Sequence, residues 1–256
     1  MITRRDFLKI AAFSSLLGLG GAFTINALEK EPGQKVLKDL NALKGKRWAM
    51  VIDTRKFKTE LDFEKVIKAC HKAHNVPEIA NPLHEVKWIW TDDYEHSFTG
   101  TAEEYISEEV KHRKFLLLCN HCGNPPCVRV CPVKATFKRP DGITMQDMHR
   151  CIGCKFCMAG CPYGARNYNF LPPRDYIKEL NPEYPTRTLG VVEKCTFCNQ
   201  RIDKGLLPYC VEASEGKIIF GDLYDPNSEI RKVLAENIVI RRKVELGTQP
   251  MVFYII

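Results

Sequence analysis

The sequence predicts an α+β protein built from two related cysteine-rich halves that follow an amino-terminal hydrophobic helix. Three observations lead to this fold class. Eleven of the twelve cysteines lie between Cys119 and Cys210, one cysteine pattern occurs twice in tandem, and short helical and strand-like patterns alternate around it. With 45% hydrophobic and 27% charged residues, the 256-residue chain is neither a disordered nor a polytopic membrane protein.

The amino terminus carries a twin-arginine pattern, Thr3-Arg-Arg-Asp-Phe-Leu-Lys9, followed by an uncharged run from Ile10 to Leu28. This combination resembles a twin-arginine (Tat) export signal. As a helix, the 19 uncharged residues would be about 28 Å long, close to the thickness of a bilayer core. The best cleavage point, near Ala27, is poor because Ile25 is not a small residue. Residues 1–28 are therefore predicted to be an export signal that is either removed or retained as an anchor.

A polar linker is predicted over residues 29–46, and the folded domain begins after it. Arg47–Asp53 is expected to be a buried strand because its centre is a continuous apolar run. Asp62 is expected to cap a helix that stops before Pro77. The apolar face of that helix comprises Phe63, Val66, Ile67 and Cys70.

Three further elements lead into the cysteine-rich centre. Val86, Trp88 and Trp90 alternate as in a strand, and both tryptophans are assigned to the core. Residues 102–112 are predicted to form a helix, and Phe115–Leu118 a short buried strand that ends at the next cysteine.

The cysteine-rich centre contains an internal repeat. Its first unit is Cys119-x2-Cys122-x4-Cys127-x3-Cys131-Pro132, and its second is Cys151-x2-Cys154-x2-Cys157-x3-Cys161-Pro162. Each unit is expected to be a cysteine loop, a helical turn and a strand, with a tight turn at Asp141-Gly142 between them. A third unit, Cys195-x2-Cys198-x11-Cys210, follows a proline-containing connection over residues 171–185.

Three closely spaced cysteines followed by a fourth and a proline are the arrangement that holds iron–sulfur clusters in bacterial ferredoxins. The close sulfurs bind one cubane, and the fourth binds the neighbouring cluster. A zinc site would use two separated pairs and has no need of a third close sulfur such as Cys157. Disulfides would suit an exported chain, but cysteines two or three residues apart in one loop are poorly placed to pair. The pattern therefore favours iron–sulfur clusters.

Several phrases extend the comparison beyond the repeat: Cys119-Asn-His-Cys-Gly-Asn-Pro-Pro-Cys127, Cys151-Ile-Gly-Cys154, Lys194-Cys-Thr-Phe-Cys198, Pro208-Tyr-Cys-Val-Glu212, Phe220-Gly-Asp-Leu223 and Glu245-Leu-Gly-Thr248. With them, the stretch from Trp48 to Ile255 resembles the four-cluster iron–sulfur subunits of molybdopterin-dependent and quinone-linked respiratory complexes. Within that family it is most similar to the DsrO type, found in Hdr-like menaquinol-oxidising complexes. The resemblance implies two ferredoxin-like iron–sulfur modules.

The chain departs from this family at one cluster site. The first three ligands of the family's first motif would fall on Phe57, Glu60 and Phe63, or on Glu60, Phe63 and Val66 in the other register. The last ligand of the final motif would fall on Ser214. The resemblance implies that the first and last motifs exchange their fourth ligands. Under this exchange, one of the two cluster sites has none of its four cysteines in this chain, and the other has all four. The phenylalanines are expected to fill the lost site as apolar packing, with Ser214 close by.

Three [4Fe-4S] clusters then account for all twelve cysteines. The central module, residues 119–185, would hold two clusters, and residues 47–118 together with 186–256 would form an outer half with one. The implied ligand sets are Cys119, Cys122, Cys127 and Cys161 (first set), Cys151, Cys154, Cys157 and Cys131 (second set), and Cys195, Cys198, Cys210 and Cys70 (third set).

The positive charge of the chain is interpreted through these clusters. Lysine and arginine exceed aspartate and glutamate by 38 − 31 = 7. An oxidised cubane with four thiolates carries a charge of about −2, so three cubanes nearly cancel the excess. A nucleic-acid surface is therefore not expected. His71, His74 and His121 lie beside ligand cysteines, and each either tunes a cluster or simply packs.

The expected function is electron transfer, because the sequence has no phosphate loop, dinucleotide fingerprint or nucleophile elbow. The resemblance implies two partners, an integral membrane quinol-interacting subunit and a cytochrome c or other redox subunit. The hetero-oligomer would lie at the extracytoplasmic, periplasmic-side face of the cell membrane. Two other classes stay open: an enzyme with an open-site cluster marked by Ser214, and a zinc-stabilised interaction module.

Overall fold

A computed structural model describes residues 41–100 and 105–256. The predicted signal over residues 1–28 and the linker up to residue 40 lie outside the described residues. The chain from Asp39 onward forms one compact unit. Within the described part of this unit, no helix is both long and apolar enough to span a membrane.

A mixed four-stranded sheet has the order β8-β1-β10-β9. Its strands are β1 (Trp48–Asp53), β8 (Ile218–Asp222), β9 (Val239–Ile240) and β10 (Val252–Ile255). β1 runs parallel to β10 and antiparallel to β8. The predicted strand at Arg47–Asp53 is confirmed, one residue shorter, and tertiary pairing places it in the interior of the sheet.

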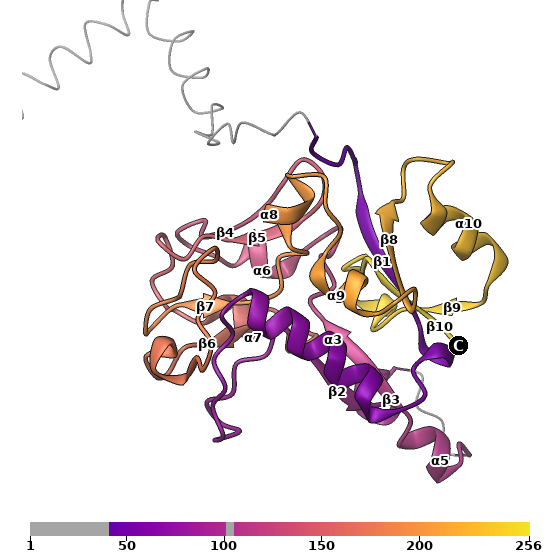
Figure 1. The fold of residues 1–256 in the computed structure, drawn as a ribbon, viewed down its shortest axis with the longest axis horizontal. Coiled ribbons are helices and arrows are strands. Elements are labelled where there is room, and N and C mark those ends of the chain that lie inside the picture. The colour runs from indigo at the N-terminus through magenta and orange to yellow at the C-terminus, as the bar shows by residue number, and fades with distance from the viewer. Residues whose placement is uncertain (1–40, 101–104) are drawn as a thin grey trace, which may run out of the picture. The chain divides into compact units, whose positions relative to one another are not determined.

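The two faces of this sheet pack against different layers. Ala49 and Val51 face helix α10 (Glu229–Glu236), which covers one side of the sheet (Figure 1). Trp48, Met50 and Ile52 face the main core, which also contains cysteines of the first and third sets. Because both faces are covered, every residue of β1 is buried, as is usual for a strand inside a sheet.

Helix α3 (Glu60–Ala73) begins two residues before Asp62. Asp62 acts from the third helical position, where its carboxylate accepts hydrogen bonds from the backbone N–H groups of Lys58 and Thr59 at 3.0 and 2.9 Å. The helix therefore extends over Glu60 and Phe63, two of the positions at which the family's first motif would place cysteines. Its apolar face packs along β2 (Ile89–Asp93), beside which lies β3 (Lys114–Leu118) (Figure 1).

Two predicted elements differ in extent. Val86 and Trp88 are buried as expected, but the strand begins only at Ile89, after them. The helix predicted over residues 102–112 is a single turn, α5 (Glu108–Lys111), in the described residues, and residues 101–104 lie outside them. Ser107 caps this turn with its hydroxyl, which accepts from the Val110 N–H. An unforeseen turn, α4 (Tyr94–Ser97), follows β2.

The cysteine-rich centre consists of short helices and two-stranded sheets, as each repeat unit predicted. β4 (Thr136–Lys138) pairs with β5 (Thr144–Gln146) across the turn at Asp141-Gly142. β6 (Asn167–Tyr168) pairs with β7 (Val192–Glu193), so this sheet joins the predicted central module to the outer half. The remaining elements are α6 (Pro126–Arg129), α7 (Phe156–Ala159), α8 (Asn199–Ile202), α9 (Tyr209–Ala213) and the 3-10 turns Thr54–Lys56, Pro173–Tyr176 and Val244–Leu246.

Candidate metal centres

The Cys-x-x-Cys loop that opens each of the three cysteine units turns through a left-handed residue at its third position. The φ angles are 40° at His121, 68° at Gly153 and 53° at Phe197. Glycine is required at Gly153, because a Cβ there would lie 2.3 Å from the carbonyl oxygen of Gly190. The backbone also donates to the sulfurs: the N–H of Phe197 lies 3.4 Å from Cys195 Sγ. These loops present thiols and backbone donors together, as a sulfur-ligated centre needs.

Cys119 and Cys122 of the first set lie in the main core with Cys161 packed against it, and Cys127 lies in a neighbouring buried cluster. Burial, together with the nearby Cys119, Cys127 and Cys161, raises the pKa of the Cys122 thiol to about 12. Burial, Cys119 and Cys127 likewise raise the pKa of Cys161. Because like charges raise each other's pKa only at close range, the fourth cysteine from the second repeat unit has reached the loop of the first.

The second set lines a small hollow that is partly open to solvent. Cys131 comes from the first repeat unit, and Cys151, Cys154 and Cys157 come from the second. Cys157 is buried, whereas Cys154 is exposed. This is the one candidate centre in the described part of the chain with an exposed cysteine.

The third set is buried throughout. Burial raises the pKa of the Cys70 thiol well above its usual value, and Cys198, Cys195 and Cys210 raise it further. Cys70 lies on α3, more than a hundred residues before the other three. Tertiary packing therefore supplies the fourth member, as the exchange of ligands between the first and last motifs implied.

Two pairs of helices position the fourth residue of each cysteine motif. α6 packs against α7 in the central module, and α3 packs against α9 in the outer half (Figure 1). Cys131 and Cys161 each follow the last turn of α6 and α7, and Ser214 stands at the corresponding position after α9. The outer half therefore repeats the central arrangement with a serine in place of one cysteine.

The positions at which the family's first motif would place ligands are filled by apolar packing. Phe57 and Phe63 are buried and stack on each other, with ring centroids 4.8 Å apart. Ser214 is also buried, and its hydroxyl is fully used: it donates to the Val211 carbonyl at 2.7 Å and accepts from the Ile218 N–H at 3.0 Å. Neither phenylalanine can ligate iron, and the hydroxyl is already engaged.

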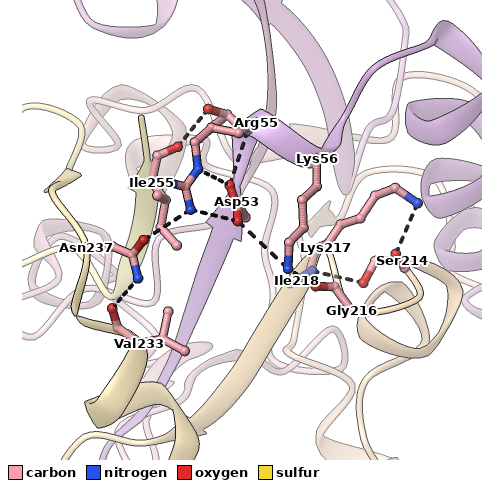
Figure 2. A network of polar contacts seen from close by, with 11 residues as sticks. Asp53, Arg55, Lys56, Ser214, Gly216, Lys217, Ile218, Val233, Asn237 and Ile255 are labelled. Carbon is pink, nitrogen blue, oxygen red and sulfur yellow. Dashed lines mark hydrogen bonds and ion pairs between the residues drawn. The ribbon is translucent and has the colours of Figure 1, made fainter. Parts of the chain in front are cut away.

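Polar contacts join the Phe57 segment to the Ser214 segment, and Figure 2 shows the one made by Lys56. Lys56 Nζ donates to the Gly216 carbonyl at 3.1 Å, beside Ser214. From α3, Lys65 forms an ion pair with Glu215, and Asp62 lies 3.3 Å from Lys217. The Phe57 and Ser214 segments therefore lie side by side, as expected from the sequence.

Buried cations surround the cysteine sets. Arg47, Arg166 and Lys194 are all buried, and in the described part of the chain none of them has a carboxylate partner. Arg166 Nη2 donates to Cys127 Sγ at 3.0 Å, and Lys194 Nζ donates to the Cys195 carbonyl at 2.7 Å. A buried cation without a counter-ion is costly. Anionic clusters held by the neighbouring thiolates would supply that counter-charge, so the site residues fit [4Fe-4S] clusters.

Buried polar atoms without partners occur in the first of these loops. Both amide atoms of Asn120 and Nε2 of His121 have no hydrogen-bond partner within the described residues. Buried groups of this kind ordinarily find partners. The sulfides and thiolates of a bound cluster would offer acceptors there. Across residues 41–100 and 105–256, no three His, Cys, Asp or Glu side chains are close enough to hold a single metal ion.

The three histidines occupy different positions. His74 Nδ1 lies 2.8 Å from the Cys70 carbonyl oxygen and 3.7 Å from Cys70 Sγ, and burial lowers its pKa to about 4. His121 accepts from the Thr144 N–H through Nδ1 and stacks on Phe197 at 3.7 Å, which joins the loops of the first and third sets. His71 is half-buried, and burial lowers its pKa.

Sequence reasoning missed a buried ion pair beside the third set. Arg187 Nη2 lies 2.5 Å from Glu193 Oε2, and both side chains are almost fully buried. Trp88 Nε1 donates to the same carboxylate at 2.7 Å, and Arg187 also bonds the His74 and Asn75 carbonyls. Arg166 and Lys194 were missed as well. Their positions in the sequence could have identified both residues, since Lys194 adjoins Cys195 and Arg166 follows Cys161 by five residues.

Comparison with known proteins places these features in a family. Residues 110–171 match the 4Fe-4S dicluster domain. The chain is 46% identical over 233 residues to the Hdr-like menaquinol oxidoreductase iron-sulfur subunit 1 of Archaeoglobus fulgidus, covering 82% of this chain and 83% of that protein. It is 34% identical over 235 residues to the menaquinone reductase, iron-sulfur cluster-binding subunit of Nitratidesulfovibrio vulgaris, covering 82% and 88%.

A further relative, the arsenate respiratory reductase iron-sulfur subunit ArrB of a Shewanella species, is 39% identical over 180 residues, which cover 57% of this chain and 76% of that protein. The Archaeoglobus match extends over more than four fifths of both chains and includes the cysteine motifs of the third set as well as the central repeat. The protein therefore belongs to the family of ferredoxin-type [4Fe-4S] iron–sulfur subunits that serve oxidoreductases in electron transfer.

Proposed function

We propose that this chain carries three [4Fe-4S] clusters and passes single electrons within a membrane-bound, quinone-linked complex of anaerobic respiration. The first cluster is held by Cys119, Cys122, Cys127 and Cys161, the second by Cys151, Cys154, Cys157 and Cys131, and the third by Cys195, Cys198, Cys210 and Cys70. The clusters supply one-electron chemistry, and the protein sets their potentials through burial, charge and hydrogen bonds to sulfur.

The proposal is carried by the assignment of all twelve cysteines to three sets of four, which the proximities within each set support. Two sets combine cysteines from both repeat units, and the third combines Cys70 of α3 with three cysteines more than a hundred residues away. No cysteine is left without a set, so every cubane would have four thiolate ligands. An enzyme with an open-site cluster would need an incomplete set.

The second set marks the end at which a redox partner would approach. Cys154 is exposed, and its neighbours Ile152 and Phe156 are 64% and 59% exposed. The third set is buried, and beyond it Phe57 and Phe63 occupy the place of a fourth cluster. The chain of clusters is therefore one site shorter than in four-cluster relatives.

The partners are proposed from the relatives and the localisation from the amino terminus. Two relatives are named as menaquinol or menaquinone oxidoreductase subunits, which supports an integral membrane quinol-interacting subunit and a second redox subunit such as a cytochrome c. The twin-arginine pattern supports export of the folded chain to the extracytoplasmic face of the membrane. The uncharged run that follows it either anchors the protein or is removed.

Iron, sulfide and zinc analysis of the anaerobically purified full-length protein tests the cluster count. Three cubanes give about twelve irons and twelve sulfides per chain. About sixteen irons would mean a fourth cluster and would contradict the vacated site. Zinc without iron would identify an interaction module instead. Electron paramagnetic resonance of the reduced protein should then show three interacting one-electron centres.

A further inference from the structure

Arg166 occupies the boundary between the first and second cysteine sets. Its side chain is 4% exposed, and its Nη2 atom donates to Cys127 Sγ of the first set at 3.0 Å. Cys127 and Cys157, which belong to different sets, pack together in one buried cluster. The guanidinium therefore lies where the two sets are nearest to each other.

The other arm of the guanidinium is held by the wall of the second set. Nη1 donates to Gln146 Oε1 at 2.7 Å and to Thr136 Oγ1 at 3.1 Å. Thr136 and Gln146 form a cross-strand pair on β4 and β5, and both line the hollow of the second set. The Thr136 hydroxyl in turn donates to Gln146 at 2.7 Å, so the two acceptor side chains hold each other in place. The Arg166 guanidinium is therefore fixed in one orientation.

The charge of Arg166 acts on both sets. Burial raises the pKa of the Cys157 thiol, and the Arg166 charge opposes that rise. Burial lowers the pKa of Arg166 itself, but Cys127, Cys157 and Cys119 more than offset this, so that its pKa is raised. Arginine stays protonated throughout the accessible pH range. In the described part of the chain it has no carboxylate partner, so its full charge faces the cysteines.

We propose that Arg166 is a shared positioning residue that raises the reduction potentials of the first and second clusters together. The inference rests on the ligand sets proposed above. Hydrogen bonds and positive charge near the sulfurs favour the reduced cluster, which carries one more negative charge. A cation that contacts one set and is fastened to the wall of the other stabilises an added electron on either. Because both potentials move in the same direction, their difference changes by less than the larger of the two shifts.

The test is a redox titration of full-length, anaerobically purified Arg166→Gln, followed by electron paramagnetic resonance. Loss of a charge-assisted hydrogen bond should lower the equilibrium constant for one-electron reduction of the first cluster by about tenfold, which lowers its reduction potential by ~59 mV. The potential of the second cluster should fall by a smaller amount. The third cluster is the internal reference and should not move. Its signal is identified by its loss in Cys70→Ala.

Two further variants separate this role from a structural one. Arg129→Gln removes an exposed arginine from α6, close in sequence to Cys127 and Cys131, and should leave all potentials unchanged because solvent screens its charge. Arg166→Lys keeps the charge without the fork and should shift the potentials by an intermediate amount. If Arg166→Gln does not retain its clusters, the lysine variant decides the question.

Three outcomes would overturn the proposal. Iron loss with unchanged potentials of the remaining clusters would mean that Arg166 only supports the fold. A shift confined to the first cluster would mean that the residue is not shared. A shift of all three clusters by equal amounts would mean a general change in the protein. If the wild-type protein itself does not contain three clusters, the proposed function is wrong. That result is seen before any variant is compared, so it is distinguishable from a failure of the role proposed for Arg166.

Discussion

The rings of Phe57 and Phe63 stack with centroids 4.8 Å apart and planes inclined by 24°, at two of the positions where the family's first motif would place ligands. Helix α3 covers the same segment, since its capping box at Thr59 and Asp62 starts the helix there. A capped helix and apolar packing therefore occupy the positions at which the family's first motif would place a cysteine loop.

Ser214→Cys should therefore recruit no fourth cluster, because one thiolate cannot replace four. The iron content should stay at the wild-type value. The variant should be destabilised by about 1–2 kcal/mol, because the Ile218 N–H loses its hydroxyl acceptor. Ser214→Ala is the matched control and should show the same loss in a thermal unfolding scan. Four additional irons in Ser214→Cys would contradict the vacated site.

Cys70→Ala should remove the third cluster or convert it to a three-iron form, and leave the other two intact. Cys70 is the only member of its set on α3, so no nearby cysteine replaces it. Val66→Ala, one turn earlier on the same buried face, is the control and should lose packing but no iron. Iron content and the spectrum of the reduced protein distinguish the two. An unchanged spectrum in Cys70→Ala would falsify its assignment to the third set.

Glu193→Gln should destabilise the protein by about 3–5 kcal/mol, because it leaves the buried charge of Arg187 without its partner. The exposed pair of Lys72 and Glu179 offers a control, since solvent screens it and Glu179→Gln should change the stability much less than Glu193→Gln does. The midpoint of unfolding of the loaded protein measures both. Equal midpoints for the two variants would show that the buried pair contributes no more than a surface one.

Asp53 should contribute a pH-dependent part of the stability. Its carboxylate accepts from Arg55 Nε at 2.9 Å and Nη2 at 3.1 Å, and Arg55 extends the network to Asn237 (Figure 2). The Arg55 hydrogen bonds hold the pKa of Asp53 below its usual value. For an acid with a lowered native pKa, the stabilisation is present above the unfolded pKa of about 3.9 and is lost as the pH falls through the native pKa.

The variant Asp53→Asn should therefore be less stable than the wild type by about 1 kcal/mol at neutral pH, a modest value because Arg55 is half-exposed. The difference should shrink as the pH falls below about 4. Unfolding midpoints measured across this pH range give the result. A difference that is constant down to about pH 3 would show that the charge of Asp53 is not the cause.

The native amino terminus should begin at or near Met1, because Ile25 makes the cleavage site near Ala27 poor. Intact-mass measurement of the protein isolated from its membrane fraction tests this. A mature chain that starts near Leu28 would show that the signal is removed, and membrane attachment would then depend on partner subunits.

Local spacing in the sequence was enough to predict the cysteine loops, the helical turns after them and the strand at β1. A Cys-x-x-Cys loop closes within four residues, and the apolar run of β1 is buried on whichever side it pairs, so neither depends on distant contacts. The same spacing predicted which cysteine of each repeat unit would belong to the neighbouring set. The resemblance then implied where the distant Cys70 would be used, and the structure brings it beside Cys195, Cys198 and Cys210.

Tertiary structure alone decided the surroundings of the cysteines. Arg166, Lys194 and Glu193 look in the sequence like ordinary charged residues. Packing alone buried them, and it placed Arg166 and Lys194 against the cysteine sets and Glu193 against Arg187. Packing likewise left Cys154 at the surface while Cys157, three residues away, is buried. Burial depends on which segments cover a residue, and those segments are distant in sequence. Local pattern therefore predicts the candidate ligands within each cysteine motif, and the fold determines which distant residues and charges act with them.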